Sequence, residues 1–141
     1  MQPPPRRRAR IGESEKQCEA RYGTPVSSDV DPLLGDQKSA LYKKSGFLVR
    51  ITFLTGRAVS IRFEKEDKSP LTIGQIRLLL AFNSGSANWK QTLTEKDGVL
   101  GWDREDGKAE ATAAADRKFL VIATSEFKLF LKAKAEGVDG F

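Results

Sequence analysis

Apolar and polar residues alternate along the middle of the chain, which is typical of β-strands with one face in a core. The positions predicted to face the core are Phe47, Val49, Ile51, Phe53, Val59, Ile61 and Phe63. The opposite face would carry Leu48, Arg50, Thr52, Leu54, Ser60 and Arg62. Because Gly56 falls between the two runs, the pattern predicts an antiparallel hairpin.

Face matching predicts the turns of this part of the chain. A three-residue loop over 54–56 keeps the apolar residues of both strands on one side. A preceding strand over 39–44 would be joined by a two-residue turn of Ser45 and Gly46. The cross-strand pairs expected from these turns are Ile51 with Val59 and Tyr42 with Val49.

Three segments are predicted to be helical. The first runs from Glu13 to Tyr22 and ends at "GTP", because glycine adopts left-handed backbone and proline cannot continue a helix. The second begins after Thr72, which forms a capping box with Gln75, and ends at Gly85. The last runs over about 126–136, with Ser125 as its N-cap.

These elements predict an α+β fold of two tandem α-β-β-β units, about 11–66 and 72–124, with a C-terminal helix after them. The helices would pack on one face of an antiparallel sheet. Segment 26–37 is predicted to be a loop, and short strands are expected near 89–93, 102–104, 108–113 and 119–124. Spacings of 60–62 residues between matching positions, such as Ile11-Gly12 and Ile73-Gly74, indicate an internal duplication. The alternative is chance coincidence of glycines at helix ends and turns.

The net charge of +5 is concentrated at the start of the chain. Arg6, Arg7, Arg8 and Arg10 supply +4 of it, which leaves +1 for residues 11–141. Residues 1–10 are expected to be a disordered Pro/Arg arm, 11–137 a single domain and 138–141 a tail. Nucleic-acid binding through the four arginines is therefore an alternative function, although no aromatic residues interleave with them for base stacking.

The chain contains few groups suited to catalysis. It has no histidine and one cysteine, which excludes Ser-His and Cys-His arrangements and an intramolecular disulfide. Cys18 is interpreted as a small core residue. The acidic residues Asp103, Glu105 and Asp106 lack the spacing of a calcium loop and are interpreted as a solvated turn. The sequence therefore predicts a non-enzymatic protein with no metal and no cofactor.

The first unit resembles a known family pattern. In "RIGESEKQCEARYGTPVSSD", Ile-Gly precedes a short helix that ends in Gly-Thr-Pro, and a strand with Tyr42 and "LVRITFLTGRAVSI" follow. Residues 11–63 are similar to the small lipoprotein of the outer-membrane β-barrel assembly machine, to the units of the β-lactamase inhibitory protein, and to exported bacterial proteins of this pattern. The resemblance implies helices on one face of an antiparallel sheet and a role in protein–protein contact. Residues 1–10 depart from the lipoproteins because they hold neither a signal nor an acylated cysteine.

The partner is expected to be another protein, and its contact surface to be the second sheet face. The candidate binding residues are Leu48, Arg50, Thr52, Leu54, Arg62 and Trp102. Two alternatives are that the second unit covers this face and that Trp102 is a core aromatic. No apolar run is long enough to span a membrane. A soluble cytoplasmic protein is expected from the sequence as it stands, or an exported one if a signal has been removed.

Overall fold

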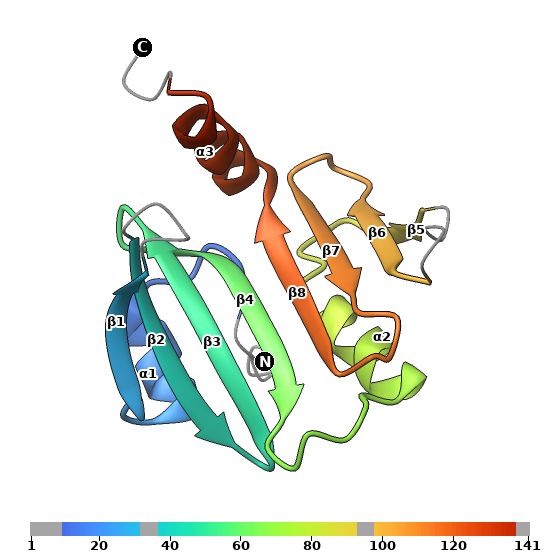
Figure 1. Ribbon diagram of the computed structural model, residues 1–141, viewed down its shortest axis with the longest axis horizontal. Helices are drawn as coiled ribbons and strands as arrows, with labels where there is room; N and C mark the ends of the chain where they lie inside the picture. Colours follow the sequence, from blue (N-terminus) through green and yellow to red (C-terminus); the bar gives the residue numbers. More distant parts are fainter. Residues whose placement is uncertain (1–9, 32–36, 93–97, 138–141) are drawn as a thin grey trace, which may run out of the picture.

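The computed structural model describes residues 10–31, 37–92 and 98–137. Within them, eight antiparallel strands form one sheet in the order β1-β2-β3-β4-β8-β7-β6-β5 (Figure 1). The strands are β1 Ser27–Asp31, β2 Gln37–Lys44, β3 Phe47–Leu54, β4 Arg57–Lys65, β5 Trp89–Gln91, β6 Leu100–Arg104, β7 Ala109–Ala113 and β8 Phe119–Thr124. The predicted α+β class with an antiparallel sheet is confirmed.

Each half of the chain supplies four consecutive strands, and the halves join where β4 pairs with β8. Ile61 lies opposite Ile122 in this junction, and both side chains are fully buried. A helix followed by strands is therefore repeated as predicted, but each unit has four strands rather than the three of the predicted α-β-β-β units. The loop predicted over 26–37 is wrong at its start, because residues 27–31 form edge strand β1. Common descent of the two units stays a prediction.

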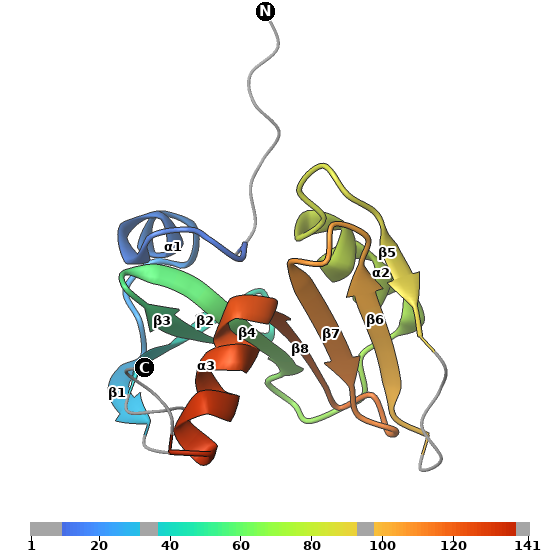
Figure 2. The ribbon, with the colours of Figure 1, turned by 90° about the horizontal axis from the view of Figure 1, so that it is seen from above.

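The helices lie on both faces of the sheet. Helices α1 (Glu15–Tyr22) and α2 (Ile73–Phe82) cover one face, whereas α3 (Ser125–Ala135) lies on the other (Figure 2). The capping box predicted for α2 is confirmed, since the Gln75 N–H donates to Thr72 Oγ1 and the Thr72 N–H to Gln75 Oε1. The N-cap of α3 is Thr124 rather than the predicted Ser125.

The two predicted hairpin registers have different outcomes. Tyr42 pairs with Val49 as expected, across a turn in which Ser45 and Gly46 both have positive φ. The pairing of Ile51 with Val59 is wrong, because the turn holds only Thr55 and Gly56 and the ladder shifts by one residue between Thr52 and Phe53. Because of this β-bulge, Ile51 pairs with Ile61 and Phe53 with Ala58, so Ala58 rather than the predicted Val59 joins the core cluster.

The Ile-Gly match between the units does not mark equivalent positions. Gly12 lies two residues before Ser14, the N-cap of α1, and has a φ of 93°. Gly74 instead lies in the first turn of α2, after the N-cap Thr72. The equal spacing in sequence therefore does not reflect equal placement in the fold.

Candidate protein-interaction surfaces

The face of the sheet opposite α1 and α2 is only partly covered by α3, which packs where β8 ends (Figure 1). Away from α3, neighbouring side chains of β3, β4 and β8 form a surface that we call the open sheet face. Its residues are Leu48, Arg50, Arg62, Glu64, Phe119 and Val121, and none of them is buried. The strand register places Leu48 opposite Glu64, Arg50 opposite Arg62, Arg62 opposite Val121 and Glu64 opposite Phe119.

Two guanidinium groups dominate the electrostatics of the open sheet face. Arg50 and Arg62 lie directly opposite each other on adjacent strands, an arrangement of like charges that is unfavourable by itself. Arg62 stacks on the Phe119 ring, 4.1 Å from its centroid, and its Nη2 lies 3.6 Å from Glu64 Oε2. Arg50 has no ion-pair partner within the described part of the chain.

The structure separates the six residues predicted to bind a partner. Leu48, Arg50 and Arg62 lie together on the open sheet face. Thr52 lies on the same face but is only 2% exposed, in the row of Ser39, Ser60 and Ala123 at the α3 end. Leu54 is half-buried beside the β3–β4 turn.

Trp102 lies on the helix-covered face. It pairs with Ala111, which pairs with the buried Ile122, and it packs against the core. Trp102 therefore lies where the alternative interpretation, that of a core aromatic, places it. Phe119 and Val121 were missed as surface residues, although the alternation of strand 119–124 could have placed them beside Arg62.

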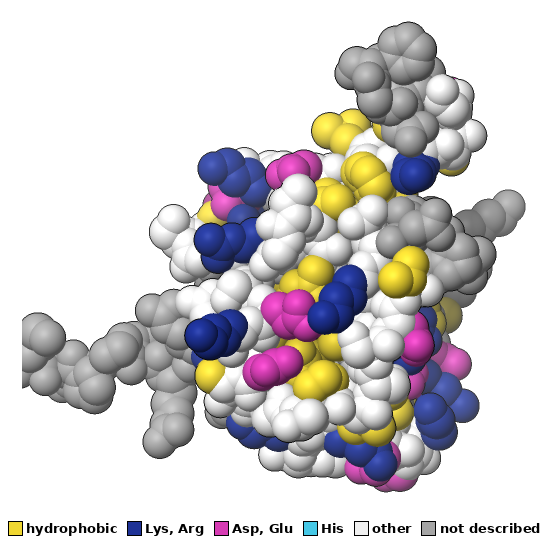
Figure 3. All heavy atoms as spheres, turned by 90° about the vertical axis from the view of Figure 1, so that its left-hand side faces the viewer, with side chains coloured by type: hydrophobic (Ala, Val, Ile, Leu, Met, Phe, Trp, Pro, Cys, Tyr) yellow, Lys and Arg dark blue, Asp and Glu magenta, His cyan; other side chains and the backbone are white. Residues whose placement is uncertain are grey.

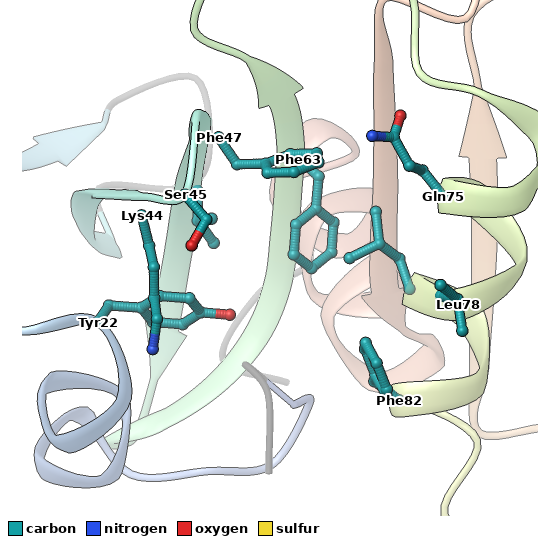
Figure 4. A pocket seen from close by; sticks show the side chains of 10 residues that line it. Tyr22, Lys44, Ser45, Phe47, Phe63, Gln75, Leu78 and Phe82 are labelled. Atoms are coloured by element: carbon teal, nitrogen blue, oxygen red, sulfur yellow. The ribbon is translucent and has the colours of Figure 1, made fainter. Parts of the chain in front are cut away.

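A second surface is a groove on the helix-covered face, between the C-terminal end of α1 and α2 (Figure 4). Its volume is about 270 Å³. Phe63 of β4 lies between the helices, while Phe82 and Tyr22 point into the groove from opposite sides, and Val49 of β3 also lines it. The full lining is Tyr22, Lys44, Ser45, Phe47, Val49, Phe63, Gln75, Leu78, Leu79 and Phe82.

Lys44 provides the positive charge of this groove. Its Nζ donates a hydrogen bond to the carbonyl oxygen of Arg21, at 2.5 Å, and lies 5.7 Å from the centroid of the Tyr22 ring. Both contacts hold the ammonium group at the α1 side of the groove. Since none of the ten lining residues is acidic, the groove combines an apolar surface with a single cation.

The edge formed by β1 has a different character. Figure 3 shows basic and acidic side chains interspersed on this side of the molecule. Lys38 and Glu15 form an ion pair here, 2.5 Å between Nζ and Oε2, and Val26 and Val30 are exposed singly. Isolated exposed valines are common on protein surfaces, so this edge does not indicate a binding site.

Of the four arginines of the nucleic-acid alternative, Arg10 lies in the described part of the chain. Arg6, Arg7 and Arg8 lie outside the described residues. Arg10 is half-buried, and its backbone N–H donates to Glu13 Oε1 at 2.9 Å. Glu13 in turn forms an almost buried ion pair with Arg21, so Arg10 belongs to the folded region rather than to an arm.

The remaining candidate groups have structural roles. Asp106 accepts hydrogen bonds from Arg104 Nε and the Lys108 N–H, which lower the pKa of its carboxyl and fix the β6–β7 turn. Cys18 is fully buried, and this burial raises the pKa of its thiol to about 11, as expected of a core residue. Within residues 10–31, 37–92 and 98–137, no three His, Cys, Asp or Glu residues converge as metal ligands.

Comparisons with known proteins give little further information. No family model matches this chain, and no curated protein matches it. Among solved structures, it is similar to a cysteine-rich secretory protein from Staphylococcus aureus subsp. aureus Mu50 at 18% identity and a TM-score of 0.45. The match covers 82% of this chain, which spans 45% of that protein.

None of the helices in the described ranges combines the length and apolar character needed to cross a membrane.

Proposed function

We propose that this chain is a non-enzymatic protein-interaction module that binds an acidic segment of another protein through the open sheet face. The observation that supports the proposal is the cross-strand pair of Arg50 and Arg62. Each guanidinium offers a planar set of donors that can bind a carboxylate through two hydrogen bonds.

The surroundings of the arginine pair are those of a protein contact surface. Phe119 and Val121 lie beside Arg62, and Leu48 lies next to Arg50 along the same face. Aromatic residues and arginine are enriched in protein interfaces, and apolar neighbours strengthen a charge-assisted hydrogen bond by excluding water. An acidic segment with apolar side chains would complement both parts of this face.

The experiment is quantitative affinity capture from an extract of the native cell. Three immobilised proteins are compared: the unaltered chain, Arg50→Glu, and Lys16→Glu as a control. Lys16 is exposed on α1, on the other face of the sheet, so its reversal changes the net charge equally. We expect the unaltered chain and the control to capture the same protein, and Arg50→Glu to reduce its recovery at least tenfold. Equal recovery with all three proteins, or recovery that is insensitive to salt, would contradict the proposal.

A further inference from the structure

Helix α2 is unusually apolar for a helix at the protein surface. It contains a single charged residue, Arg77, and its sequence is IGQIRLLLAF. Ile76 and Leu80 point into the core, but Ile73 and Leu78 are 44% and 58% exposed. A helix that is apolar on all sides normally has partners on all sides. The side of α2 that carries Leu78 therefore lacks a partner within the described structure.

The groove beside α2 extends this apolar surface. Leu78 forms part of the groove wall, so the exposed side of the helix and the groove are continuous. The groove volume of about 270 Å³ lies below the roughly 300–1,000 Å³ of sites that enclose small molecules. It is also partly open to solvent rather than enclosed, which suits side chains that project from a longer segment.

The shape of the groove favours a helical segment over an extended one. The groove floor consists of β3 and β4, which are paired on both sides, so no free strand edge is available for strand addition. The ten residues of α2 extend about 15 Å, the length of nearly three helical turns. A second helix lying along α2 would place residues i, i+3 or i+4, and i+7 in the groove.

We infer that the groove between α1 and α2 binds an amphipathic helix of a partner protein, with its apolar side in the groove and an acidic residue next to Lys44. The charge follows from Lys44, which has no ion-pair partner among the described residues and is the only charged residue in the lining. This site lies on the face of the sheet opposite Arg50 and Arg62, so it is distinct from the proposed open sheet face.

The test uses a displayed library of random twelve-residue peptides. Peptides are selected on the full chain and depleted on its Leu78→Asp variant, which is expected to fold because Leu78 is exposed. We expect the surviving peptides to have apolar residues at helical spacing and a net negative charge. Survivors with strand-like alternation or a net positive charge, or no enrichment over the depleted pool, would overturn the inference.

Fluorescence polarisation then measures the affinity of the consensus peptide for three variants whose folding is checked by circular dichroism. Leu78→Asp should weaken binding at least tenfold, since it removes an apolar contact that the bound peptide would bury. Lys44→Gln should weaken it about two- to fivefold, as expected of an exposed ion pair. Arg50→Glu should leave it unchanged, which separates this site from the open sheet face. Equal affinity for Leu78→Asp and the unaltered chain would overturn the inference.

Discussion

Each unit contributes four consecutive strands to the sheet, but the helices of the two units contribute differently to the core. In the first unit the strands supply the large buried side chains, among them Tyr42, Ile51 and Phe63, and the only buried residue of α1 is Cys18. In the second unit, β8 contributes Leu120 and Ile122, β7 contributes only small residues, and α2 contributes the buried Ile76 and Leu80. The buried residues of β7 are Ala109, Ala111 and Ala113.

The space between helix and sheet can be filled by side chains from the helix or from the strands. Protein interiors are packed at nearly constant density, so small side chains on the sheet require large ones on the helix, and the reverse. It also explains why α2 is the more apolar helix. The units differ further in their aromatic residues, since both tryptophans belong to the second unit and both tyrosines to the first.

The largest loss of stability is expected from a substitution where the two units meet. Ile61→Ala removes a fully buried side chain beside Ile122 and should lower the free energy of unfolding by about 2–5 kcal/mol. Urea unfolding is followed by far-ultraviolet circular dichroism, which reports on both units, and by fluorescence of Trp89 and Trp102, which reports on the second. We expect both midpoints to shift together. Separate midpoints would show that the units fold independently.

The next effect tests the ion pair that anchors α1. Glu13 bonds to Arg21 through both carboxylate oxygens and also accepts the Arg10 N–H. Glu13→Ala should cost about 3 kcal/mol of stability, because it leaves the nearly buried Arg21 guanidinium without its carboxylate. Thermal unfolding measures this loss. Glu13→Gln, which keeps one acceptor oxygen, should cost less, and an equal loss would show that charge is the essential property.

A smaller effect tests the packing contrast itself. Ala111→Leu adds volume to the sheet layer that α2 already fills, so it should cost about 1–3 kcal/mol. The control is Ala81→Leu on α2, at an exposed position, which should change stability by less than about 0.5 kcal/mol. Urea unfolding compares the two. If Ala111→Leu were neutral, the second unit would contain unfilled space beside β7.

The smallest effect concerns a buried hydroxyl in the first unit. Tyr42 Oη makes no hydrogen bond to any described residue. Tyr42→Phe should therefore change stability by less than about 1 kcal/mol, in the stabilising direction, because no bond is lost and a polar group leaves the core. Urea unfolding at pH 7 tests this. A loss above 1 kcal/mol would show that the hydroxyl has a partner, such as a bound water.

Alkaline pH provides a related test of the first unit. Burial raises the pKa of Tyr42 from 10.0 to about 12 and that of Cys18 from 9.0 to about 11. Both groups lose their proton more easily in the unfolded chain. Stability should be unaffected by them below pH 9 and should fall as the pH rises from 9 to 12. In Tyr42→Phe this fall should be smaller, as measured by urea unfolding at a series of pH values.

The sequence predicted most of the fold because its signals are local. Strand 119–124 was predicted with the observed bounds, and the capping box of Thr72 and Gln75 was identified, since both depend on residues close in sequence. The α+β class follows from the same patterns. Strand β1 was missed because "SSDVD" has few apolar residues. Its extended conformation is stabilised by pairing with β2.

Features that depend on distant residues could not be predicted in this way. The alternation of apolar residues is satisfied both by the predicted three-residue loop and by the observed two-residue turn with a β-bulge after Thr52, so it cannot distinguish the two. Helices α1 and α2 lie together on the first face of the sheet. The position of α3 on the second face depends on the path that the chain takes after Thr124. The groove was not predicted, because its walls come from α1, β3, β4 and α2, which are brought together only by folding.

The pairing of β4 with β8 also has a consequence for assembly. Every hydrogen bond across this pair joins the two halves of the chain, and only the connection over 66–72 links them covalently. Two molecules could therefore exchange halves and form a domain-swapped dimer that keeps the complete sheet of each original monomer. Within one molecule, the residues of this connection are the covalent link that keeps the two halves together.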